Sequence, residues 1–152
     1  MTILHSYAID TIDDINDIER STYNNTTRIL LIEDSKSDVF LVKRMLRNVS
    51  KDDELEITDV PRMVDALELL DDAEFDVVLL DLSLLDIDGV AAVTALHAVT
   101  PNTPIIVYSG TQDPKLREGA MMCGAKHFLM KGKESAFSLK FMIQQACVCE
   151  AI

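Results

Sequence analysis

The sequence predicts an α/β domain built on a parallel, doubly wound sheet of five strands. From residue 28 onward, short apolar runs rich in valine, isoleucine and leucine alternate with longer amphipathic segments, and this alternation is typical of parallel sheets with helices on both faces. Four of the runs stop on polar side chains, at Glu33-Asp34, Asp81, Ser109 and Lys131. Because ligands bind outside the carboxyl ends of parallel strands, we expect these polar groups to meet at one edge of the sheet.

The first half of the domain contains two predicted strands and two predicted helices. Arg28–Glu33 is a continuous apolar run that ends on a carboxylate, and Ser37–Val49 carries apolar residues at helical spacing. Leu55–Val60 is more polar, which places this strand near an edge of the sheet. Pro61–Asp72 is predicted to be a helix with its proline near the start, where a missing N–H costs little.

The middle of the domain begins with the most apolar run, Phe75–Asp81, which is therefore the predicted central strand. A loop through Asp88 leads to a predicted helix over Gly89–Val99. The fourth strand, Pro104–Ser109, follows a short turn that contains two prolines.

Three further elements complete the domain. The predicted helix Pro114–Cys123 is stopped by Gly124, a residue that easily adopts a left-handed cap. His127–Lys131 is the fifth strand, and Ser135–Cys149 is the last helix.

The composition excludes several classes of protein. A net charge of −12 argues against a nucleic-acid-binding surface, which needs clustered lysine and arginine. No apolar stretch approaches the roughly 20 residues of a membrane span, and the N-terminus shows no secretory signal. The three cysteines form no CxxC pair and their number is odd, so we expect reduced thiols in a cytoplasmic protein.

Residues 1–27 differ from the rest of the chain. They contain no glycine or proline, they are acidic, and isoleucine recurs at every third position from Ile9 to Ile18. A segment of this kind forms either a flexible leader or a short helix. We therefore expect an acidic N-terminal leader over 1–27 and one domain over 28–152.

The polar groups at the strand ends suit one kind of chemistry. Three carboxylates that converge within a few ångströms repel one another unless a cation joins them, and a hard divalent ion such as Mg2+ removes that cost. A carboxylate in such a site can attack phosphorus and become an aspartyl phosphate. Lys131 would then supply a point charge, and Ser109 a neutral donor, to the phosphoryl oxygens.

Five elements resemble, in order and spacing, the receiver domain of two-component response regulators. They are ILLIEDS, VVLLDLSLLDIDG, PIIVYSG, GAKHFLMK and the amphipathic helix that follows. The resemblance covers Arg28 to about Cys149 and implies the flavodoxin-like strand order 2-1-3-4-5. It also implies a signalling protein rather than an enzyme, although one that catalyses its own phosphorylation and dephosphorylation.

The resemblance further implies roles for individual residues. Asp81 would accept the phosphoryl group, and Lys131 would pair with it. Ser109 would be the switch hydroxyl and Phe128 the switch aromatic. The implied Mg2+ contacts come from Asp34 directly, from Glu33 often through water, from Asp81 and from the backbone carbonyl of Ser83.

Two positions depart from the pattern of this family. The family usually has proline after the lysine, joined by a cis peptide bond, and this chain has Gly132. Proline is also common four residues after the phosphoacceptor, where this chain has Leu85. Glycine removes the proline-specific reason for a cis bond, so we expect a differently shaped loop around Lys131.

The implied phosphoryl donor is a histidine kinase or a histidine phosphotransfer protein, and the implied reader is an unknown downstream protein. Phosphorylation would draw Ser109 toward the phosphoryl group and let Phe128 move inward. These shifts would bias the face made by the helix Pro114–Cys123, the strand His127–Lys131 and the helix Ser135–Cys149.

The last helix carries two apolar stripes. The stripe expected to pack on the sheet consists of Leu139, Met142, Ile143 and Ala146. The second stripe consists of Phe137, Phe141 and Val148. Because a globular helix needs only one apolar stripe, we expect the second to meet a homodimer mate, a partner protein or the N-terminal isoleucines.

Two other functions remain open. The run LLDIDGV, with Asp86 and Asp88, resembles the nucleophile motif of haloacid-dehalogenase-type phosphatases, although Asp86 follows a strand that already ended at Asp81. A degenerate receiver that acts only through protein–protein contacts is the other alternative. A phosphoryl adduct on Asp81 would support the receiver, and sustained turnover through Asp86 would support the phosphatase. Neither result would support the degenerate receiver.

Overall fold

The computed structural model describes residues 26–148 and contains five parallel strands in the order β2-β1-β3-β4-β5. The strands are β1 (Thr27–Ile32), β2 (Leu55–Val60), β3 (Val77–Leu80), β4 (Ile105–Ser109) and β5 (His127–Met130). The helices are α2 (Lys36–Asn48), α3 (Met63–Asp72), α4 (Gly89–Val99), α5 (Pro114–Met122) and α6 (Ala136–Val148). The predicted class and strand order are confirmed, whereas the predicted leader lies almost wholly outside the described residues.

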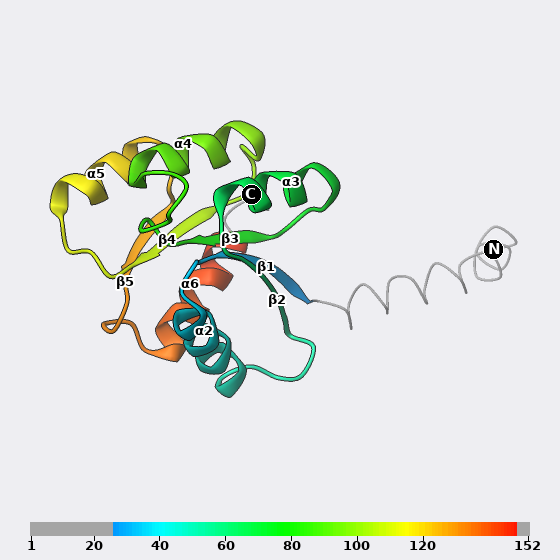
Figure 1. Ribbon diagram of the computed structural model, residues 1–152. Coiled ribbons are helices and arrows are strands. Elements are labelled where there is room, and N and C mark those ends of the chain that lie inside the picture. Colours follow the sequence, from blue (N-terminus) through cyan, green and yellow to red (C-terminus); the bar gives the residue numbers. More distant parts are fainter. Residues whose placement is uncertain (1–25, 149–152) are drawn as a thin grey trace, which may run out of the picture.

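Helices cover both faces of the sheet. Figure 1 shows α3, α4 and α5 on one face and α2 and α6 on the other. In the central strand, Leu79 and Leu80 are both fully buried but belong to different apolar clusters, because successive side chains of a strand point to opposite faces. Burial on both faces is why the strands are continuous apolar runs. Within the described part of the chain, no helix has the length and apolarity to span a membrane.

Two predicted starts are two residues too early, whereas the other boundaries agree with the structure to within one residue. The third strand starts at Val77 rather than Phe75, and the second helix of the domain starts at Met63 rather than Pro61. The backbone N–H groups of Met63 and Val64 donate to the two carboxylate oxygens of Asp86, at 3.1 Å each. A carboxylate from a distant loop therefore caps this helix and defines its first turn.

The loop after β5 has a shape that only glycine allows easily. Gly132 has a φ of +82°, and the peptide bonds of the described residues are all trans. Proline, whose ring holds φ near −65°, could not adopt this conformation. The prediction of a differently shaped loop after Lys131 agrees with this backbone, which places Lys131 directly beyond the end of β5.

Candidate functional site

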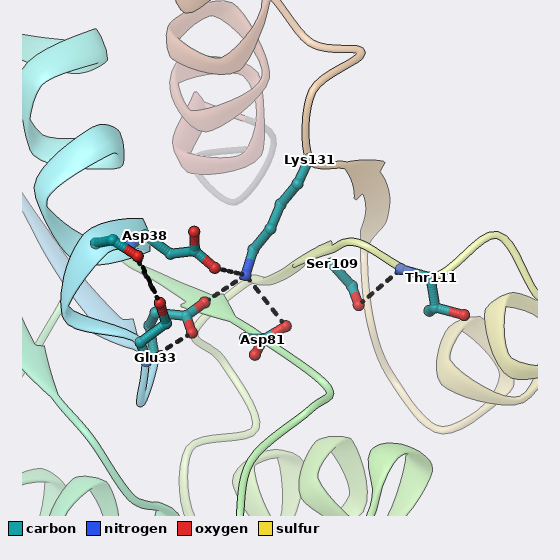
Figure 2. Close-up of polar contacts among 8 residues, drawn as sticks. Glu33, Asp38, Asp81, Ser109, Thr111 and Lys131 are labelled. Carbon is teal, nitrogen blue, oxygen red and sulfur yellow. Dashed lines mark hydrogen bonds and ion pairs between the residues drawn. The ribbon is translucent and has the colours of Figure 1, made fainter.

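The polar residues that follow the strands meet at the carboxyl edge of the sheet. The register pairs Ile32 with Leu80, so the next residues, Glu33 and Asp81, lie side by side. The Asp81 N–H donates to the carbonyl oxygen of Ile32 at 3.0 Å, which continues the ladder one residue further. On the other side of the site, the Lys131 N–H donates to the Ser109 carbonyl oxygen at 2.9 Å. Backbone pairing thus brings together groups that are far apart in the sequence (Figure 2).

Three carboxylates form a group that suits a metal ion. Glu33, Asp34 and Asp81 each offer an oxygen, and these oxygens lie within 4.8 Å of one another. Glu33 is 3% and Asp81 4% exposed, and Asp81 Oδ1 is buried with no hydrogen-bond partner. A buried carboxylate oxygen that has no donor and faces two further acids needs a positive charge close by. Three oxygen ligands of this kind fit a hard cation such as Mg2+, which binds one or two carboxylates and keeps several waters.

The Lys131 ammonium group is the positive charge of the site. Its Nζ lies 2.6 Å from Glu33 Oε2, 2.9 Å from Asp38 Oδ2 and 3.5 Å from Asp81 Oδ1. Burial alone would lower the pKa of Lys131, but the hydrogen bonds to Glu33 and Asp38 and the charge of Asp81 outweigh it and raise this pKa. Lys131 therefore lies beside Asp81, with its ammonium closer to Glu33 and Asp38.

Glu33 responds to the same surroundings in a less simple way. Burial raises the pKa of this carboxyl group, while hydrogen bonds from Lys131 and from the Ser35 N–H lower it. An ion pair by itself would lower the pKa of Glu33, just as the same pair helps to raise the pKa of Lys131. Because the residue is only 3% exposed, burial outweighs the pairing and the pKa of Glu33 is raised.

The turn between β1 and α2 positions the acids. Ser35 is the N-cap of α2, and its Oγ accepts the Asp38 N–H at 3.3 Å. The Ser35 N–H donates to Glu33 Oε1 at 3.1 Å. A capped helix start therefore directs Glu33 and Asp38 toward the same point above the sheet.

The predicted switch residues lie on the β4–β5 side of the site. Ser109 is fully buried, and its Oγ accepts the Thr111 N–H at 3.4 Å. Phe128 is 9% exposed and belongs to the same apolar cluster as Leu80 and Val107. Phe128 is thus already buried in this structure, and its movement on phosphorylation stays a prediction.

Two features of the site were not predicted from the sequence. Asp38 contacts Lys131 although it is not at a strand end; the only signal was an acidic residue in the first turn of a helix that starts at the site. Asp86, the nucleophile of the alternative phosphatase, uses both carboxylate oxygens to cap α3. That engagement disfavours a nucleophilic role.

Ser83 lies exposed in the loop after β3, and the role of its carbonyl group stays a prediction.

Comparisons with known proteins agree with this geometry. The family model of the response regulator receiver domain matches residues 29–139. The chemotaxis protein CheY of Listeria monocytogenes is 28% identical over 103 residues, which are 67% of this chain and 84% of that protein. The autoinducer 2 sensor kinase/phosphatase LuxQ of Vibrio cholerae is 29% identical over 111 residues, which are 72% of this chain but 12% of LuxQ.

Solved structures show the same fold at low identity. A CheY-like receiver domain protein from Methanospirillum hungatei superimposes with a TM-score of 0.73 at 19% identity, covering 83% of this chain and 97% of that one. The receiver domain of a sensor histidine kinase from Pseudomonas aeruginosa, with a magnesium ion coordinated in its active site cleft, has a TM-score of 0.70 at 23% identity. That match covers 81% of this chain and 98% of the other.

Proposed function

The chain belongs to the response regulator receiver domain family of two-component signalling, and on that premise we propose that Asp81 accepts a phosphoryl group in a Mg2+-dependent reaction. The observation that carries the proposal is the Asp81 carboxylate itself. It is buried, one of its oxygens has no hydrogen bond, and it lies beside both a cationic lysine and two further acids. A carboxylate held in this way is an unsolvated nucleophile in a site built to compensate charge.

The reaction would use the residues of this site as follows. A carboxylate oxygen of Asp81 attacks phosphorus, an O–P bond forms, and the bond from phosphorus to the donor atom breaks. Lys131 pairs with one phosphoryl oxygen, and the Ser109 hydroxyl donates to another. Mg2+, held by Asp34, Glu33, Asp81 and the Ser83 carbonyl, would supply the remaining charge compensation.

The expected donor is the phosphohistidine of a histidine kinase or of a histidine phosphotransfer protein. Both CheY and the sensor kinase/phosphatase LuxQ are among the matched relatives. Because the chain spans only about an eighth of LuxQ, the activity of that whole protein is no guide to the output here. The downstream reader is a further protein, and we expect phosphorylation to bias the face of α5, β5 and α6 that it reads.

We expect incubation with Mg2+ and acetyl phosphate to give one phosphoryl adduct per chain, located on Asp81. Intact-mass spectrometry followed by peptide mapping measures it. Removal of divalent ions with a chelator should suppress the adduct, because the acids would then repel the incoming phosphoryl group. An adduct that forms equally well with the chelator would contradict the metal requirement, and no adduct under any condition would favour the degenerate receiver.

The last helix also presents a surface that the fold does not use. Leu139, Ile143 and Ala146 are fully buried against the sheet. The second stripe points away from it, with Phe137, Phe141 and Val148 exposed by 73%, 58% and 60%. We propose that a second copy of the chain covers this stripe, since exposed aromatic side chains gathered on one helix are typical of interfaces.

Replacement of Phe141 by Asp should convert a dimer into a monomer, because a charge at the centre of the stripe would have to be buried without a partner. Sedimentation or light scattering of the full chain at several concentrations measures the change. Phe40→Asp is the matched control, since Phe40 is 62% exposed on a different helix. A wild-type chain that is monomeric at every concentration would contradict the dimer.

A further inference from the structure

Lys131 has a carboxylate partner outside the acids of the predicted metal group. We propose that Asp38 is a positioning residue that holds the Lys131 ammonium on the α2 side of the site and so opposes its transfer to a phosphoryl group on Asp81. This inference rests on the proposed function, because the transfer matters only if Asp81 is phosphorylated.

The distances show where the lysine is held. Lys131 Nζ is 2.9 Å from Asp38 Oδ2 but 3.5 Å from Asp81 Oδ1, and Asp81 Oδ1 receives no hydrogen bond. Figure 2 shows the ammonium joined to Asp38, to Glu33 in the turn after β1, and to Asp81. The lysine is therefore hydrogen-bonded away from the residue that would carry the phosphoryl group.

Asp38 differs from Glu33, the other hydrogen-bonded partner of the lysine. Glu33 belongs to the three-acid group whose oxygens lie within 4.8 Å of one another, and Asp38 does not. A cation bound to that group would engage Glu33 and weaken its bond to Lys131. Asp38 would then remain hydrogen-bonded to Lys131, so Asp38 is the acid that competes with a phosphoryl group for the lysine ammonium.

The surroundings favour the contact between Asp38 and Lys131, although the Asp38 side chain is 36% exposed. The backbone of Asp38 is fixed by the N-cap of α2, and a carboxylate in the first turn of a helix is favoured by the helix dipole. Both side chains line a cavity of about 170 Å³ whose other walls include Leu41, Met45 and Tyr108. These neighbours are mainly apolar, so the partly exposed pair is screened less than a fully solvated pair would be.

The test is the affinity of the full chain for beryllium fluoride, a phosphoryl mimic, in the presence of Mg2+. Asp38→Asn should bind the mimic roughly three- to tenfold more tightly than the wild type, since groups in direct contact are coupled by this order. Asp38→Ala should shift the affinity in the same direction, which guards against a local effect of the amide. Thermal unfolding of each variant shows that it is folded.

The control separates the contact from a general loss of negative charge. Glu134 lies near the same cavity, since its charge, like those of Asp38 and Lys131, acts on Tyr108. Its carboxylate accepts the Ser138 hydroxyl instead of contacting the lysine. Glu134→Gln should leave the affinity within about twofold. Equal tightening by Glu134→Gln, or unchanged or weaker binding by Asp38→Asn, would overturn the inference, whereas a wild-type chain that does not bind the mimic would overturn the proposed function itself.

Discussion

The Asp81→Asn variant should form no phosphoryl adduct with acetyl phosphate and Mg2+. Asparagine keeps the shape of the side chain but replaces the nucleophilic carboxylate by a neutral amide, and it removes one of the three acids that would hold the ion. Loss of a nucleophile from an enzyme site commonly lowers the rate by roughly 10⁴- to 10⁶-fold. A decrease of this size takes the adduct below detection by intact-mass spectrometry.

The variant should nevertheless fold at least as well as the wild type when divalent ions are absent. Asp81 Oδ1 is buried without a hydrogen-bond partner, and its neighbours include Glu33, so a neutral amide relieves a repulsion. Asp86→Asn is the matched control: it should keep the adduct but lose thermal stability, because Asp86 caps α3. An adduct that persists in Asp81→Asn and disappears in Asp86→Asn would contradict the assignment of the nucleophile.

The sequence predicts the fold well because the strands of this domain are buried on both faces. A continuous apolar run such as Val77–Leu80 has no equally good alternative to a central parallel strand. Boundaries were less predictable where a distant residue decides them. The start of α3 depends on Asp86, which is more than twenty residues further along the chain and has no local signature as a cap.

The site was predictable to the extent that strand ends determine it. Glu33, Asp81 and Lys131 meet because the parallel register aligns the ends of β1, β3 and the β4–β5 pair. Asp38 was missed because a residue in the first turn of a helix can point in several directions, and only the Ser35 cap directs it to the lysine. Phe128, which the resemblance implied would move inward on phosphorylation, is already buried in the apolar core, where side-chain packing fixes its position.

Lys131→Ala should destabilise the fold when divalent ions are absent. The change leaves Glu33 and Asp81, exposed by 3% and 4%, without their cation. Removal of one partner of a buried ion pair costs about 3–5 kcal/mol, and the lower end applies here because the lysine side chain is 21% exposed. Lys133→Ala is the matched control, since Lys133 is exposed in the same loop and should change the free energy of unfolding by less than about 0.5 kcal/mol.

The loss caused by Lys131→Ala should depend on pH and on Mg2+ in a way that a packing defect would not. Without the lysine, burial raises the pKa of Glu33 further. An acid of this kind has a higher pKa in the folded chain than in the unfolded chain. It costs no stability at a pH below its unfolded pKa, and the fold loses stability as the pH rises from there toward the folded pKa. The deficit, measured by thermal unfolding, should therefore be larger near pH 7.5 than near pH 5. Mg2+ should reduce it at the higher pH, because the ion would neutralise the same carboxylates as the lysine. An equal deficit at both pH values, unchanged by Mg2+, would mean that Lys131 stabilises the chain through its aliphatic contacts rather than its charge.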